Sequence, residues 1–267
     1  MISKNQRVLL TALKSVSKLL NIKFIAHNDG WVIELQKNHN SHYIYGYNFP
    51  NNNAAASRLC DDKSAVYEIL TKHHLPAVSH FYFMNPKNPN SWNKDVIGSG
   101  NALLNKYKSI VVKPNNGTGG DYVFLVNTPS QLLEAVNKIF NRFDYLTISP
   151  FIKITNEYRL IMLNNEPLLI YEKIRQPNEW RHNLQLGAKA SIVVDKLIVK
   201  KLISLSQKVV MSMNINFCSV DIVKVGGQYK ILEINSGVML EKFATQSPAN
   251  YSVALKIYKQ ALQQIKF

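Results

Sequence analysis

The chain has 267 residues, of which 46% are hydrophobic and 18% charged, a composition that suits one large domain or two lobes and excludes a disordered chain. No apolar run approaches the roughly 20 residues that a membrane-spanning helix needs, so no membrane partner is expected. Lys and Arg number 32 against 17 Asp and Glu, a formal net charge of +15, which favours anionic partners without choosing among nucleic acid, lipid, nucleotide and acidic peptide. The basic residues are spread along the chain without a dense block, so a solvated basic surface is the simpler explanation and nucleic-acid binding is not favoured.

The amino-terminal segment predicts an amphipathic helix over residues 6–20, because its apolar residues recur at helical spacing and Lys14 and Lys18 interrupt them. This pattern is not that of an export signal. The two cysteines, Cys60 and Cys218, lack the spacing of a disulfide framework or a zinc site. We therefore expect a protein of the reducing cytoplasm.

In the first half of the chain, short apolar segments bounded by polar turns predict strands, and a long alanine-containing segment predicts a helix. The expected strands are 23–27, 31–36, 42–49 and 79–84, and the expected helix covers most of 51–74.

The second half alternates strands with capped helices. Thr128, Pro129 and Gln131 predict the start of a helix, and Asp195 predicts the N-cap of a long amphipathic helix. The expected strands are 109–114, 121–126, 146–152, 157–163 and 167–174, followed by a hairpin over 217–235 and a terminal helix over 251–265. Because several strands are linked as hairpins, the pattern predicts an α+β protein with antiparallel sheets rather than a doubly wound parallel sheet.

The first candidate site is the segment SIVVKPNNGTGGDYVFLV, in which a glycine-rich loop joins two strands. Glycines allow backbone N–H groups to approach phosphates, and Lys113 at the end of the first strand can place its ammonium on a phosphate. The loop lacks the P-loop pattern, and a plain hairpin explains it about as well.

The second candidate site is the hairpin DIVKVGGQYKILEIN, which carries Asp221, Glu233 and Asn235 between apolar residues. Oxygen ligands without His or Cys suit a hard cation such as Mg²⁺, although an edge hairpin with solvated carboxylates is the alternative. Both carboxylates share one face only if the hairpin loop has an odd length, so we predict a three-residue loop over 226–228.

The third candidate site joins the strand ITNEYRLIML to the polar loop YEKIRQPNEWRHNLQLGAKA. Glu157 and Arg159 share one strand face by period two, and Arg175, Arg181 and Asn183 follow in the loop. Arginine stabilises carboxylate and phosphoryl oxygens, although a surface loop on a basic protein explains the same residues.

The order of these segments resembles the ATP-grasp ligase superfamily over about residues 55–245. It resembles most the branch that contains ribosomal-protein glutamate ligases, cyanophycin synthetase and glutathione synthetases. The segment DDKSAVYEILTKHHLPAV adds to the resemblance, since it is similar to a family segment that places a lysine, here Lys63, near the nucleotide or the interface between the lobes. The resemblance implies an ATP-grasp fold of two α+β lobes that grip ATP.

The resemblance also implies a role for individual residues. Arg175 and Asn183 match residues near the transferred phosphate, and Asp221, Glu233 and Asn235 match ligands of Mg²⁺ or Mn²⁺. The residues implied at the nucleotide are Lys63, Lys113, Gly117, Gly119, Gly120, Ser149, Phe151, Ile152 and Glu157, the last as a ribose contact. Two departures affect the details: Ser149-Pro150 stands where the adenine hinge usually carries an acid or amide, and SGVMLEKFA replaces the common Pro-Gly after EIN.

The implied activity is an ATP-dependent carboxylate–amine ligase that acts through an acyl phosphate on amino-acid or peptide substrates, at least one of them anionic. An ATP-binding phosphotransferase or a non-ligase partner protein with the same fold is the alternative. The expected organisation is a reduced amino-terminal region over 1–55 and an ATP-grasp domain over 56–267, with lobes of about 56–145 and 146–267, and a homo-oligomer is compatible with it.

Overall fold

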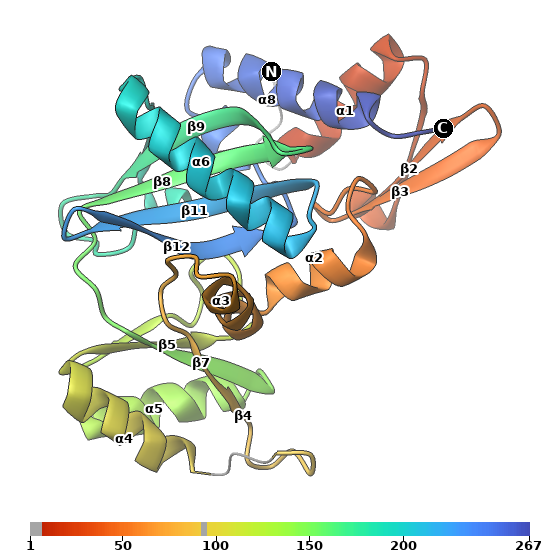
Figure 1. The fold of residues 1–267 in the computed structure, drawn as a ribbon. Helices are drawn as coiled ribbons and strands as arrows, with labels where there is room; N and C mark the ends of the chain where they lie inside the picture. Colours follow the sequence, from red (N-terminus) through yellow and green to blue (C-terminus); the bar gives the residue numbers. More distant parts are fainter. Residues whose placement is uncertain (1–6, 92–94) are drawn as a thin grey trace. The chain divides into compact units, whose positions relative to one another are not determined.

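The computed structural model describes residues 7–91 and 95–267, and these form two compact units (Figure 1). Within these described ranges, unit 1 takes its residues from the segments Met1–Arg58, Glu157–Asp221 and Asn235–Phe267, and unit 2 from Leu59–Asn156 and Ile222–Ile234. The predicted lobes are continuous in sequence, whereas each unit combines separated segments. The predicted lobe boundaries stay a prediction. No helix in the described ranges is both long and apolar enough to cross a membrane.

Unit 1 begins with helix α1 (Val8–Leu19) and a three-stranded antiparallel sheet in the order β1-β2-β3. Its bounds are β1 (Lys23–His27), β2 (Val32–Lys37) and β3 (Asn40–Tyr45). The third strand is shorter than predicted, because Gly46 takes a positive φ of 60° and the chain turns back so that Tyr45 bridges Asn48.

A five-stranded sheet in the order β10-β9-β8-β11-β12 carries the polar residues discussed below. Its bounds are β8 (Asn156–Leu163), β9 (Glu166–Ile174), β10 (Lys189–Ile192), β11 (Phe217–Val225) and β12 (Gln228–Asn235). Helix α6 (Lys196–Met213) lies across this sheet (Figure 1), and Asp195 caps it as predicted by accepting hydrogen bonds from the amides of Leu197 and Ile198.

The core of unit 1 joins the two ends of the chain. Phe49 stacks on Tyr258 and meets Phe217 edge to face, with ring centroids 5.8 Å and 5.0 Å away. Tyr258 lies in helix α8 (Pro248–Gln263), which contacts α1 and the short helix α7 (Glu241–Ala244). The amino-terminal residues therefore share one hydrophobic core with the carboxyl-terminal helix.

Unit 2 contains a four-stranded antiparallel sheet in the order β4-β7-β5-β6. Its bounds are β4 (Phe81–Met84), β5 (Ile110–Pro114), β6 (Phe124–Val126) and β7 (Tyr145–Pro150). Helices α4 (Val96–Tyr107) and α5 (Pro129–Phe140) lie side by side on one face of it (Figure 1). Leu132, Ile139 and Ile148 are among the buried residues of this core, and Thr128 caps α5 as predicted.

The helix predicted over 51–74 is two helices, α2 (Ala54–Asp61) and α3 (Lys63–Lys72). Asp62 separates them because its backbone is extended (φ −102°, ψ 99°) and its carboxylate accepts a hydrogen bond from the amide of Ala65. This N-cap, which sequence periodicity does not reveal, matters for the site.

The prediction of a three-residue loop in the last hairpin is wrong. β11 ends at Val225 and β12 begins at Gln228, and Gly226 and Gly227 between them have φ of 55° and 82°. Two positive φ values are typical of a type I′ turn, which joins antiparallel strands through two residues. In β12 the buried residues Ile231 and Ile234 are three positions apart, so the alternation of buried and exposed side chains is interrupted in this strand. The length of the hairpin loop therefore does not decide on which face of the sheet Glu233 lies.

Candidate functional site

In unit 2, the glycine-rich loop is attached to the start of α3 by polar contacts. The buried side chain of Asn115 donates to Asp62 (Nδ2–Oδ1 2.8 Å) and accepts from the amide of Ser64 (3.1 Å). Lys63 Nζ donates to the carbonyl oxygens of Gly117 (2.6 Å) and Asn115 (3.3 Å). The first half of the loop is thus anchored by three consecutive residues, 62–64.

The second half of the loop offers backbone without side chains. Gly119 and Gly120 have φ of 73° and 87°, a region that L-residues rarely adopt. A Cβ atom at Gly119 would meet no atom within 4 Å. The backbone at Gly119 is therefore open to a ligand, and phosphate binding by this loop stays a prediction.

Lys113 and Lys63 both act electrostatically on His80, a residue that the sequence analysis missed. The Nδ1 atom of His80 lies 2.8 Å from the carbonyl oxygen of Val78, and a carbonyl only accepts, so Nδ1 carries the hydrogen. Burial, followed by the charges of Lys113 and Lys63, holds the pKa of His80 well below its usual value. The ring is thus neutral and its buried Nε2 is an acceptor. Nothing in the sequence around His80 indicates that its ring is buried, neutral and near Lys113 and Lys63.

The residues predicted at the adenine lie on or next to β7, the direct neighbour of β5. Ser149 on β7 is buried and pairs with Val111 on β5. In the same register, Thr147 on β7 pairs with Lys113 on β5. The amide of Phe151 donates to the carbonyl of Ser109 (3.0 Å), and Phe151 and Ile152 are half-buried. Lys63, Lys113, the loop glycines and this segment therefore belong to one unit, although contact with adenine stays a prediction.

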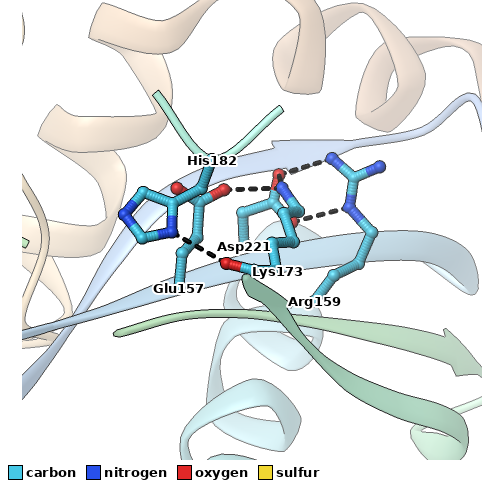
Figure 2. A network of polar contacts seen from close by, with 5 residues as sticks. All are labelled: Glu157, Arg159, Lys173, His182 and Asp221. Carbon is cyan, nitrogen blue, oxygen red and sulfur yellow. Dashed lines mark hydrogen bonds and ion pairs between the residues drawn. The ribbon is translucent and has the colours of Figure 1, made fainter. Parts of the chain in front are cut away.

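In unit 1, a buried ionic network joins three neighbouring strands (Figure 2). Arg159 on β8 binds Asp221 on β11 through two parallel hydrogen bonds, Nε–Oδ1 at 2.7 Å and Nη2–Oδ2 at 2.6 Å. Lys173 on β9 places Nζ 2.9 Å from Asp221 Oδ2 and 2.6 Å from Glu157 Oε1. The side chain of Asp221 has no exposed surface, and that of Lys173 is 5% exposed. Two cations and two anions thus balance each other inside the protein.

The pKa values follow from this balance. Burial raises the pKa of Asp221, but Arg159 and Lys173 outweigh it, so the pKa lies well below its usual value. Burial and Arg159 lower the pKa of Lys173, but Asp221 and Glu157 outweigh them, so the pKa lies above its usual value. Both groups are therefore charged at neutral pH.

The predicted arginine loop starts at the end of β9 and is tied back to it. His182 Nδ1 lies 2.8 Å from the carbonyl oxygen of Lys173, which attaches the loop to the ionic network (Figure 2). Arg181 pairs with Glu179 (Nη2–Oε2 2.8 Å), mainly through a hydrogen bond that lowers the pKa of Glu179 to about 2. Arg175 is exposed, and its Nη1 donates to the carbonyl of Glu179 (2.9 Å), while Asn183 is half-buried.

The remaining predicted site residues differ in how far they are buried and in what they pair with. Glu157 is buried and paired with Lys173, and a contact with ribose stays a prediction. Glu233 and Asn235 are half-buried, and the described ranges hold no group of three or more His, Cys, Asp or Glu able to bind a metal. Lys173 was missed, but Leu169, Tyr171 and Lys173 alternate along the buried face of β9, and a lysine in that register is a signal of a buried ion pair.

Comparison with known proteins identifies similar sequences and folds. The model of the RimK-like ATP-grasp domain matches residues 60–259. A probable alpha-L-glutamate ligase of Shewanella pealeana is 27% identical over 183 residues, 67% of this chain and 37% of that protein. The tetrahydromethanopterin:alpha-L-glutamate ligase of Methanocaldococcus jannaschii is 25% identical over 171 residues, 61% of this chain and 56% of that protein. The chain thus covers less than two thirds of either relative.

Among solved structures, D-alanyl-alanine synthetase A of Vibrio cholerae has a TM-score of 0.66 at 13% identity and covers 96% of this chain and 94% of its own. At that identity the likeness concerns the fold alone. It confirms the α+β architecture with antiparallel sheets predicted from the sequence.

Proposed function

Because the chain belongs to the RimK-like ATP-grasp domain family, we propose that it is an ATP-dependent ligase that joins a carboxylate to an amine. The observation that carries the proposal is the family match over residues 60–259, which includes the anchored glycine loop, the arginine loop and the last hairpin. Both named relatives are alpha-L-glutamate ligases, which supports L-glutamate as the first substrate to test. The net charge of +15 supports an anionic substrate as well.

The residues of unit 2 suit the nucleotide. Lys113 and Lys63 would offset phosphate charge, and the loop with Gly117, Gly119 and Gly120 would donate backbone N–H groups to phosphate oxygens. Ser149, Phe151 and Ile152 would contact the adenine. Glu157, which belongs to unit 1, would contact the ribose.

The reaction that we propose has two steps. The γ-phosphoryl group of ATP passes to the carboxylate oxygen and gives an acyl phosphate and ADP. The amine then attacks the acyl carbon, and phosphate leaves as the amide bond forms. Arg175 and Asn183 would hold the transferred phosphoryl oxygens, because a guanidinium and an amide donate hydrogen bonds to developing negative charge.

Magnesium, or manganese in its place, is part of the proposal. Glu233 and Asn235 supply the oxygen ligands that such hard cations prefer. When bound, the ion would neutralise phosphate charge. Asp221, the third predicted ligand, has both oxygens already engaged by protein cations and does not fit this role.

The test is ADP release that depends on both substrates. The purified chain is supplied with ATP, Mg²⁺ and L-glutamate, and amines and carboxylates from amino acids to acidic peptides are varied, with mass spectrometry of the product. We expect sustained ADP release above background only when a carboxylate and an amine are both present, because the carboxylate alone supports only the first step. Sustained ADP release with one substrate alone would instead support a phosphotransferase, and no substrate-dependent release would reject both.

A matched pair of variants locates the activity. Arg175→Ala should lower turnover about 100-fold, the usual loss when one charge-stabilising donor is removed. Arg142→Ala is the control. Arg142 is an exposed arginine of unit 2 that donates a hydrogen bond to the hydroxyl of Tyr122 and is not among the predicted site residues. Equal activity of the two variants would remove Arg175 from the site.

A further inference from the structure

The surroundings of Asp221 differ from those of a metal ligand. A carboxylate offers about four lone-pair sites, and three of those on Asp221 accept hydrogen bonds from Arg159 and Lys173. The side chain is fully buried. A magnesium ion demands near-octahedral oxygen ligands at about 2.0–2.1 Å and retains several waters, for which this packed carboxylate leaves no provision.

The charges lead to the same conclusion. Arg159 and Lys173 already neutralise Asp221 and Glu157, one cation for each anion. A divalent cation bound here without phosphates would add two positive charges to a buried network that is already balanced, which is strongly unfavourable.

Lys173 also occupies the position that a bridging ion would take. Its ammonium lies between two carboxylates, 2.9 Å from Asp221 Oδ2 and 2.6 Å from Glu157 Oε1 (Figure 2). The side chain reaches this point from β9 on a buried strand position, and its backbone carbonyl accepts a hydrogen bond from His182.

We propose that the ammonium of Lys173 is a resident cation that takes the place of a metal ion between Asp221 and Glu157, so that metal binding by this chain does not use Asp221. Asp221 is then a positioning residue, which holds the cationic groups of Arg159 and Lys173 in the sheet. The inference about which residues bind metal rests on the proposed function, whereas the inference about Lys173 rests on the network alone.

The first experiment needs neither nucleotide nor activity. Lys173→Met keeps a long side chain but removes the ammonium, which leaves Asp221 and Glu157 with Arg159 as their only cation within the network. Millimolar Mn²⁺ should raise the melting temperature of this variant by several degrees more than that of the wild type, in which only the proposed site at Glu233 and Asn235 can bind the ion. The control is Lys201→Met, at an exposed position of α6. An equal effect of Mn²⁺ on the wild type and Lys173→Met would overturn the proposal.

The second experiment keeps the proposal testable should Lys173→Met not fold. Mn²⁺ binding in the presence of ADP is measured by electron paramagnetic resonance for the wild type, Asp221→Asn and Glu233→Gln. Asp221→Asn should keep the dissociation constant of Mn²⁺ within about twofold, and Glu233→Gln should raise it about tenfold, or 1.4 kcal/mol. A tenfold rise for folded Asp221→Asn would overturn the proposal. Failure of the wild type to bind Mn²⁺ with ADP would count against the proposed magnesium site, and the first experiment would still decide the role of Lys173.

Discussion

At the scale of single residues, the ionic network shows how one buried carboxylate depends on its partners. Asp221 has a folded-state pKa below the value of about 3.9 expected in the unfolded chain. Its ion pairs therefore contribute stability that is present above about pH 4 and is lost as the pH falls further, because the unfolded state then binds the proton more readily.

Asp221→Asn should accordingly lower the free energy of unfolding by about 3–5 kcal/mol at neutral pH, since it leaves buried cations uncompensated. The difference from the wild type should shrink as the pH falls below about 4. Urea unfolding at several pH values measures it, with Asp29→Asn at an exposed position as the control. A difference that stays constant down to pH 2 would contradict the assignment of the lowered pKa.

Lys113 gives the second prediction at this scale. Lys113→Ala should weaken ATP binding about tenfold or more, because a charged hydrogen bond contributes about 1.5–3 kcal/mol. The melting temperature should change little, since the residue lies at the end of β5 and is half-buried. Calorimetry compares it with Lys106→Ala, an exposed lysine of α4, and an unchanged affinity would remove Lys113 from the nucleotide site.

At the scale of elements, helix α3 and the glycine loop form one structural feature. Asp62 caps α3 and also holds Asn115, whereas Asp95 caps α4 through the amide of Gly98 (2.8 Å). The sequence predicts that the loop 114–120 is mobile without nucleotide, because it has three glycines and no apolar anchor. The polar anchor at 62–64 confines the expected motion to the tip at Thr118–Gly120.

These two caps provide a matched comparison. Asp95→Ala should lower the free energy of unfolding by about 1 kcal/mol, the usual value of an N-cap, and Asp62→Ala should lower it further because the buried Asn115 also loses a partner. Asp62→Ala alone should also weaken ATP binding severalfold, because Asn115 and the loop lose their attachment. Urea unfolding and calorimetry measure the two effects. Identical ATP affinities of the two variants would show that the anchor does not serve the nucleotide.

At the scale of the whole molecule, the charge of +15 acts on encounters rather than on the fold. The kcat/KM for an anionic substrate such as L-glutamate should fall severalfold between low and physiological ionic strength, because salt screens the attraction. The neutral L-glutamine serves as the control substrate in the same stopped-flow or coupled assay. A salt-independent kcat/KM, or activity confined to neutral or cationic substrates, would show that the charge serves another purpose.

Features that depend on neighbouring residues, or on the order of segments along the chain, could be predicted from the amino-acid sequence. The capping residues Thr128 and Asp195 predicted the starts of α5 and α6 correctly, because a helix start is decided within four residues. The order from Lys113 through the arginine loop to the last hairpin was enough to predict the family and the α+β architecture, both confirmed.

Which charged side chains pair with one another could not be predicted in this way, because it depends on the folded sheet. Arg159, Lys173 and Asp221 lie on three different strands, and the order β9-β8-β11 brings them together in a way that no spacing along the chain reveals. The three-residue loop was predicted wrongly because it was chosen to suit a shared metal, whereas two glycines with positive φ make a two-residue turn that matches strand twist. Ion pairing in a protein interior depends on which strands are neighbours and on the exclusion of water, and both arise only when the sheet has formed.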